Sequence, residues 1–290
     1  MKKALVLIGL LSPFFLVAQV KLSGVYKAVN DSLYYIENVS WDRLMTERDE
    51  LQAENFHLTD IEVLKEKDLI RFWAICKEGA AVDTIQHIVR WDSLIRQKRK
   101  MFKEGFVMQD LEYYRDEEGQ DHFIAFWNKG TSTHKVWKFD SREAMYKKIA
   151  QHNKSDLFLH DIEPVQMGDE YAFLAIFHRG LPRERTYLYE SDSLAFFNED
   201  RLRRIKSGYR IKDFERFYEN EKATYFAIYE KGNHTDFYTV AQTEEDFEER
   251  IDSRKDEEEL LKLFDIEVQS VKNEQKKKYK FKFKNDLENN

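Results

Sequence analysis

The chain has 290 residues, of which 35% are charged and 14% aromatic, with ten glycines, three prolines and a formal net charge of −7. This composition supplies enough apolar material for a core and lacks the bias of disordered chains. The acidic balance argues against general affinity for nucleic acid or anionic membranes, which attract basic surfaces. Cys76 is the only cysteine, so an internal disulfide is excluded, and its apolar surroundings predict a buried structural thiol.

Residues 1–18 are typical of a secretory signal peptide. Lys2 and Lys3 form its charged start, an apolar run follows, and Ala18 suits a cleavage site before Gln19. The run is too short to span a membrane, and no cysteine follows it to carry a lipid. We therefore expect an exported protein, periplasmic or secreted, that is not a lipoprotein and has no membrane span. Loss of the two lysines changes the net charge from −7 to −9.

A tripeptide of aspartate, an apolar residue and glutamate recurs along the chain. Its aspartates stand at positions 60, 110, 161, 213 and 265, so the steps are 50, 51, 52 and 52 residues. A second motif, which runs from an aromatic residue through a fixed alanine to a glycine, follows each of the first four tripeptides. It occupies residues 72–79, 123–130, 173–180 and 225–232. Two motifs that keep step over four copies indicate tandem repeats of one unit.

Each copy predicts three strands and one helix. The tripeptide lies on the first strand, and the aromatic motif is apolar on both faces, which predicts a second strand buried on both sides. A β-branched and aromatic segment such as 84–89 predicts the third strand. The helix that follows is expected to begin at Asp92, Asp140, Ser191 or Thr243 and to end near a left-handed glycine, as at Gly105 and Gly208. The expected fold class is α+β, with tandem β-β-β-α repeats.

The repeats predict one domain over residues 19–290. It contains a partial unit at 22–56, full units at 57–106, 107–156, 157–208 and 209–260, and a partial unit at 261–284. The N-terminal part lacks a first strand and the C-terminal part supplies one, so the two parts could close a five-unit, propeller-like ring. Residues 24–30 also fit a second strand, which would duplicate rather than complement the C-terminal part. A closed ring and an open, curved array therefore both remain.

The stretch from Gly208-Tyr209-Arg210 through the strand 225–232 to Phe247 resembles the bacterial tandem repeat domain. That family has a Gly-Tyr-Arg opening, an aromatic-Ala-Ala-Ile-Trp-Glu-Lys strand and a helix near a phenylalanine. Its repeats occur beside serine hydrolase domains resembling β-lactamases, as in polyglycine hydrolases, where they are the non-catalytic portion. The likeness covers the four full copies, but several lack the second alanine and the tryptophan, and the His-Gly-Leu element is absent. The resemblance implies a recognition or scaffold role and transfers no catalytic residue.

No enzyme motif appears in the sequence. Ser132 and Lys135 match Ser-x-x-Lys, but they fall at a turn rather than at a helix start, and Lys-Thr-Gly is absent. The eight histidines are scattered, and His152 and His160 lie closest to a shared neighbourhood without a ligand-like spacing. We predict no catalytic residue and no cofactor, and a metal site gathered from distant side chains stays open.

The acidic tripeptide is the candidate repeated site. Aspartate and glutamate two residues apart on a strand project from the same face, so the copies could form a ring or stripe of carboxylates. Such a site could hold calcium or a cationic partner. Alternatively, each aspartate accepts backbone or Arg/Lys hydrogen bonds at a corner of its unit, which the recurrence of the unit favours. The candidate residues are Asp60, Glu62, Asp110, Glu112, Asp161, Glu163, Asp213, Glu215, Asp265 and Glu267.

The leading functional hypothesis is a non-enzymatic exported protein whose broad repeat surface binds another macromolecule, protein or envelope polysaccharide. Nucleic acid is not an expected partner. One alternative is a hydrolase-type enzyme with a site assembled across repeats, which predicts one copy with clustered polar residues in a concave pocket. The other is a structural or assembly component. The alternating lysines and aromatics of 276–284 are expected to keep a terminal strand soluble.

Overall fold

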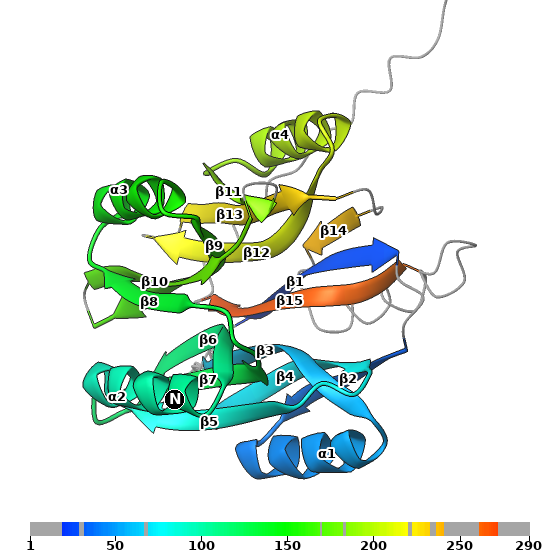
Figure 1. Ribbon diagram of the computed structural model, residues 1–290. Helices are drawn as coiled ribbons and strands as arrows, with labels where there is room; N and C mark the ends of the chain where they lie inside the picture. The colour runs from blue at the N-terminus through cyan, green and yellow to red at the C-terminus, as the bar shows by residue number, and fades with distance from the viewer. Residues whose placement is uncertain are drawn as a thin grey trace, which may run out of the picture.

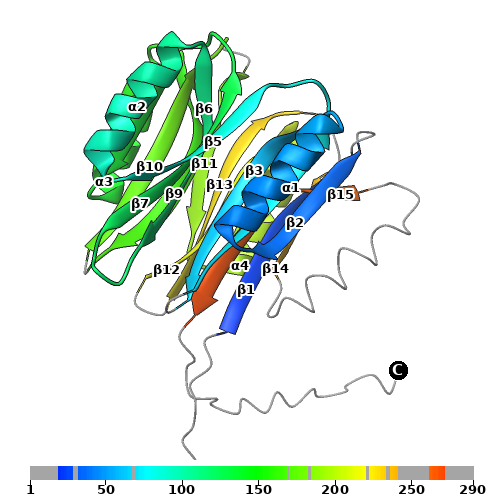
Figure 2. The same ribbon diagram turned by 90° about the horizontal axis from the view of Figure 1, so that it is seen from below.

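The computed structural model describes residues 19–28, 32–66, 69–168, 170–181, 184–219, 222–232, 236–240 and 261–271. The predicted signal peptide, Thr243 and the segment 276–284 lie outside these residues. Within the described part of the chain, the strands form five three-stranded antiparallel sheets, and four helices lie at the periphery (Figures 1 and 2). The α+β class and the repetition of strands and helices are confirmed.

Four of the sheets are each built from one continuous stretch of chain that runs strand, helix, strand, strand. The first sheet has β2 (Leu33–Val39), α1 (Trp41–Ala53), β3 (Phe56–Glu66) and β4 (Leu69–Glu78). The second has β5 (Asp83–Val89), α2 (Trp91–Lys103), β6 (Phe106–Arg115) and β7 (Asp121–Lys129). The third has β8 (His134–Phe139), α3 (Arg142–Asn153), β9 (Leu157–Met167) and β10 (Glu170–Arg179). The fourth has β11 (Tyr187–Ser191), α4 (Leu194–Lys206), β12 (Tyr209–Glu219) and β13 (Lys222–Lys231).

The order within every sheet links consecutive copies of the sequence repeat. In these four sheets the aromatic-motif strand is central, the tripeptide strand forms one edge, and the other edge is the third strand of the preceding copy. For example, β5 follows β4 in the chain but pairs with β7 of the second sheet. The length of a sequence repeat does not show at which element a structural unit begins. The repeat can therefore be written as β-β-β-α, whereas each of these sheets is built from a β-α-β-β stretch of the chain.

The fifth sheet joins the two ends of the described chain. It contains β1 (Gln19–Ala28) between β14 (Asp236–Val240) and β15 (Leu261–Val271), with antiparallel pairing on both sides. Strand β1 thus takes the central position, and β15 carries the fifth tripeptide at the edge. Residues 24–28 therefore complement the C-terminal strands within one sheet.

The helices begin one or two residues from the expected caps. Ser40, Ser141 and Ser193 cap α1, α3 and α4, and each side chain accepts an N–H from three residues further on. Helix α2 follows Arg90, which makes no side-chain cap hydrogen bond. The expectations of Asp92, Asp140 and Ser191 were wrong, because a neighbouring residue takes the capping position; the Ser191 hydroxyl instead donates to the Ser193 carbonyl.

A left-handed residue after each helix holds the end of the central strand. Gly105 and Gly208 have φ of 78° and 74°, as the sequence predicts, and Asn55 and Asp156 take the same conformation in the other two copies. The carbonyl of each accepts the N–H of the glycine that ends the aromatic motif, at distances from 2.7 to 3.1 Å. These hydrogen bonds fix the helix end against its sheet in all four copies.

The cores lie between neighbouring sheets. Phe72, Ala74 and Cys76 of the first sheet pack with Ile124 and Phe126 of the second. Phe123, Ala125 and Trp127 on the opposite face of the second sheet pack with Leu174 and Ile176 of the third. The central strands are therefore buried on both faces, as predicted, and Cys76 is buried.

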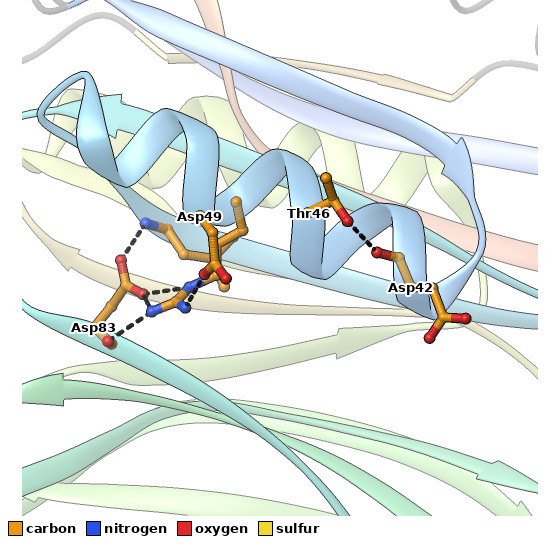
Figure 3. A network of polar contacts seen from close by, with 6 residues as sticks. Asp42, Thr46, Asp49 and Asp83 are labelled. Carbon is orange, nitrogen blue, oxygen red and sulfur yellow. Dashed lines mark hydrogen bonds and ion pairs between the residues drawn. The ribbon is translucent and has the colours of Figure 1, made fainter.

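A polar contact also ties the first two sheets together (Figure 3). The guanidinium of Arg48 on α1 donates from Nε to the carboxylate of Asp83 at 2.9 Å and from Nη2 to its backbone carbonyl at 2.8 Å. The other carboxylate oxygen of Asp83 accepts the Leu58 N–H at 2.8 Å. Asp83 begins β5, so these bonds fix where the chain enters the second sheet.

Candidate functional site

The tripeptide strands lie side by side on the inner side of the sheets. Strand β3 contacts β6, β6 contacts β9, β9 contacts β12, and β15 contacts both β12 and β3. Residues from several copies are therefore brought into one neighbourhood.

A β-bulge immediately precedes the aspartate in all five sheets. The pairing register skips one residue there, for instance between Leu58 and Asp60 on β3. The skipped residues are Thr59, Gln109, His160, Lys212 and Phe264. A bulge re-aims side chains and is common next to functional sites. In the first four sheets, the skipped residue and its aspartate face the same space.

The inner cavity defined by these residues has a volume of about 280 Å³. Asp60, Asp110, Asp161 and Asp213 line it, together with the residue before each. Of the predicted glutamates, Glu62 and Glu215 line the cavity, whereas Glu112 and Glu163 are not among its lining residues. The side chains of Asp265 and Glu267 lie outside the described part of the structure. The structure thus brings together six of the ten candidate residues.

The aspartates also make the backbone contacts expected of structural residues. The Asp110 carboxylate accepts the N–H of Ile61, in the tripeptide of the preceding copy, at 3.2 Å. The Lys212 ammonium donates to the His160 carbonyl, and the Thr59 hydroxyl donates to the Ile75 carbonyl at 3.0 Å. The same residues therefore line the cavity and form hydrogen bonds to neighbouring strands.

The crowding of carboxylates favours their protonated forms. Burial, followed by the charge of Asp213, raises the pKa of Asp110 to about 7, although hydrogen bonds from Ile61 and Leu111 oppose the shift. Burial and the charges of Asp110 and Asp213 raise the pKa of Asp161 well above its ordinary value. Lys212 lowers both pKa values but does not cancel these effects. The inner cavity therefore holds protons near neutral pH.

The histidines beside the cavity are neutral. His160 stacks on His178 with ring centroids 3.7 Å apart, and His178 Nε2 donates to the Met108 carbonyl at 2.6 Å. Burial, followed by the positive charge of Lys212, lowers the pKa of His160, and burial lowers the pKa of His178 to about 3. His152 instead packs against Phe177 and Trp137. In the described residues, no group of three or more His, Cys, Asp or Glu is placed to hold a metal ion.

A larger hollow, the outer groove, lies between the third and fourth sheets and has a volume of about 1060 Å³. One lining position, at the start of the helix, differs between the copies. Trp41 and Trp91 there pack edge-on against Phe72 and Phe123, with centroids 5.4 and 5.7 Å apart. The third copy has Arg142 instead, and its guanidinium carbon lies 5.9 Å from the Phe173 ring. Where two copies have an indole, the third has a guanidinium that lines the outer groove.

Charged side chains that line the outer groove form ion pairs with one another. Arg142 bridges Glu190 at 3.1 Å and Glu219 at 2.7 Å. Lys222 pairs with Asp192, and Arg203 pairs with Asp200. With Glu199, the lining contains three cations and five carboxylates. The groove is thus net acidic, and each of its cations already has a carboxylate partner.

Aromatic side chains border the same groove. Phe196, on the first turn of α4, is 63% exposed, and Tyr146 is 38% exposed while its hydroxyl donates to Glu190 at 2.8 Å. A large exposed aromatic beside fixed polar groups is typical of ligand sites. Sequence reasoning missed this groove, although the loss of the Trp41 and Trp91 counterpart at Arg142 was a visible signal.

No family model and no curated protein matches this chain. The resemblance to the bacterial tandem repeat domain therefore stays a prediction. In the described part of the chain, every helix is too short or too polar to cross a membrane.

Proposed function

We propose that this protein is a non-enzymatic, exported binding protein whose outer groove holds a neutral polysaccharide of the cell envelope. The observation that carries the proposal is the cavity of about 1060 Å³, in which Arg142 takes the position that tryptophan has in the first two copies. Ligand sites commonly have volumes of about 300 to 1,000 Å³. The predicted signal peptide and the predicted family resemblance agree with an extracytoplasmic recognition role.

The chemistry of the groove favours a neutral, hydroxyl-rich ligand. Arg142, Arg203 and Lys222 are already paired with carboxylates, so a polyanion would have to displace those partners and face the remaining negative charge. Sugar hydroxyls can donate to the carboxylates and accept from the cations, while a ring packs on an exposed aromatic face such as Phe196. A basic protein segment is the competing occupant, because it would also suit the acidic excess.

The binding surface is presented by a five-part ring in this proposal. Pairing of β1 with β14 and β15, and contact of β15 with both β12 and β3, support closure over an open array. A closed ring has no free sheet to extend, so it disfavours the assembly-component alternative. Closure would also hold the third and fourth sheets at a fixed angle, which preorganises the groove between them.

Affinity electrophoresis of the mature chain, residues 19–290, in gels containing neutral or anionic polysaccharides tests this function. Arg142→Trp restores the residue of the first two copies and should fill the groove, and Phe196→Ala removes the exposed ring. Each is expected to weaken retardation by a neutral polymer about tenfold, as for loss of a central binding contact. Leu202→Ala is the matched control, since Leu202 is 53% exposed on the same helix but does not line the groove.

Three outcomes would overturn the proposal. The first is equal retardation of both groove variants and the control, and the second is retardation by anionic polymers alone. The third is retention of a basic protein but of no neutral polysaccharide, which would assign the groove to a protein partner. Thermal unfolding of each variant separates loss of binding from loss of folding.

A further inference from the structure

A second groove, here called the first groove, lies at the corresponding place between the first and second sheets. Its volume is about 370 Å³. The start of α1 contributes Trp41, the first sheet contributes Phe72, and the second sheet contributes His87 and Tyr114. Unlike the outer groove, it keeps its tryptophan, and its polar lining residues are Ser40, Asp42, His87 and Tyr114.

His87 is the outer end of a chain of hydrogen bonds. Its Nε2 lies 2.8 Å from Nδ1 of His122, and Nε2 of His122 lies 2.8 Å from a carboxylate oxygen of Asp116. The Tyr114 hydroxyl lies 2.9 Å from the same Nε2 of His87. The His122 and Tyr114 rings are stacked at 4.7 Å and both are buried, whereas His87 is exposed.

The partners fix where the protons lie. An ionised carboxylate only accepts, so Nε2 of His122 donates to Asp116, and with one proton on each ring Nδ1 of His122 is an acceptor. The proton between the two rings is therefore on Nε2 of His87, which leaves Nδ1 of His87 as an acceptor. Since Nε2 of His87 then has no lone pair to offer, the Tyr114 oxygen shares the same N–H as a second acceptor, and its own hydroxyl proton is available to a ligand in the groove.

Among the four sheets whose side chains the structure describes, the second alone has this polar set. The positions that match His87 in the register of the third and fourth sheets are Lys138 and Glu190. The residues that match His122, directly before the aromatic motif, are Arg71, Ala172 and Thr224. Recurrence of the fold therefore does not account for the relay, because the other copies fold without it.

We propose that the first groove is a second ligand site, which takes a single hydroxyl-bearing ring such as one sugar residue. Trp41 and Phe72 supply apolar faces, Nδ1 of His87 accepts a ligand hydroxyl, and Tyr114 donates to a ligand oxygen. The site has its own residues and does not depend on the outer groove, so either proposal can fail alone.

Binding at this site is linked to one proton. The charged and titratable groups around His87 are Asp42 on α1, Tyr114 on β6, His122 on β7 and Asp116 in the turn before it. Burial, then the charge of His122, lowers the pKa of His87, so the ring is neutral at pH 7. Protonation at Nδ1 removes the acceptor, and the relay then stabilises the positive charge beside Asp116. Affinity should be full above the pKa of the relay and fall tenfold for each pH unit below it.

Histidine and indole signals in the NMR spectrum of the mature chain, titrated with methyl β-glucopyranoside, test the site. We expect saturable shifts of His87, His122 and Trp41 at pH 7.5, with a dissociation constant on the order of 1 to 10 mM. His87→Gln should abolish them, Tyr114→Phe should weaken binding about fivefold, and His57→Gln on β3 should leave binding unchanged. Asp116→Asn removes the charge that stabilises the protonated relay, so the acid loss of binding should move to lower pH.

The pH dependence separates a ligand contact from a structural role. A residue that only supports the fold would change unfolding but would not move the pH at which binding is lost. The inference is overturned if the sugar causes no saturable shift, if the shifts survive His87→Gln, or if affinity is the same at pH 7.5 and pH 4.5.

Discussion

The Asp110 carboxylate accepts the backbone N–H of Ile61 at 3.2 Å, so the tripeptide of one copy holds the tripeptide strand of the copy before it. Asp110 also lines the inner cavity with Asp60, Asp161 and Asp213. The hydrogen bond from Ile61 keeps the Asp110 carboxylate in place, while burial and the charge of Asp213 disfavour its ionised form. This conflict leads to a measurable dependence of stability on pH.

Stability should fall as the pH rises through neutrality because of Asp110. Its folded pKa of about 7 lies above the ordinary value of 3.8, so the folded state binds more protons than the unfolded state between these values. The stabilising contribution is complete below pH 4 and is lost towards pH 8. Asp110→Asn, which stays neutral, should raise the melting temperature at pH 8 by at least about 2 °C and flatten the trend between pH 5 and pH 8. The exposed Asp92→Asn is the control, and equal pH trends in all three proteins would contradict the prediction.

His134 should produce the opposite trend in acid. It is 2% exposed among Phe102, Trp127 and His178, and burial lowers its pKa from 6.5 to about 4. Its contribution is therefore present above pH 6.5 and lost as the pH falls towards 4. His134→Phe keeps an aromatic ring but cannot be protonated, so its stability relative to wild type should rise by up to about 1.4 kcal/mol per pH unit below 6.5. Urea unfolding at pH 7 and pH 5 measures the difference, and an unchanged gap between the two proteins would refute it.

The contact of Arg48 with Asp83 should be the most costly ion pair to break. Asp83 is 4% exposed and also accepts the Leu58 N–H, so Asp83→Ala removes the buried carboxylate that both the partly buried Arg48 guanidinium and the Leu58 N–H use. We expect a loss of about 3 kcal/mol or more in the free energy of unfolding. Asp49→Ala removes a carboxylate that pairs with the same Arg48 but is 66% exposed, and should cost about 1 kcal/mol or less. Equal losses in the two variants would show that burial does not decide the effect.

The features that recur in every copy could be predicted from the sequence. The sequence did not show which sheet each third strand joins, nor the features that occur in a single copy. The period, the doubly buried central strands and the left-handed Gly105 and Gly208 follow from local patterns, and the structure confirms them. The exchange of third strands between sheets was missed, because β4 and β5 are adjacent in the chain whichever sheet β5 joins. Cap positions were misplaced where two polar residues compete, as at Asp140 and Ser141.

The candidate site was predicted in part for a similar reason. Asp60, Asp110, Asp161 and Asp213 are constant and could be found as a motif, whereas the residues before them vary from Thr59 to Lys212. The bulge that turns those residues towards the cavity appears only in the strand register. Both grooves arise between sheets, from residues that are far apart in the chain, such as Trp41 and His87.

The proposed closure of the ring predicts that the N-terminal strand β1 and the C-terminal strand β15 can be linked covalently. Lys21 lies opposite Gln269, and Leu22 lies opposite Val268, on antiparallel strands. Opposite residues there have Cα atoms about 4.5 to 5.5 Å apart, which suits a disulfide. Oxidation of the Lys21→Cys/Gln269→Cys or Leu22→Cys/Val268→Cys variant should give a monomer with faster mobility on a non-reducing gel. Because the linked loop is very long, the bond should also raise the free energy of unfolding by about 4 kcal/mol.

The matched control for this link is Lys21→Cys with Lys262→Cys. Lys262 pairs with Lys27, six residues along the strand from Lys21, so the two cysteines would be about 20 Å apart and should not join. Burial raises the pKa of the Cys76 thiol to about 12, so the natural cysteine should not compete for the link. Disulfides that form only between two chains would mean that the N-terminal strand completes the sheet of a second copy, and the closed ring would then be wrong.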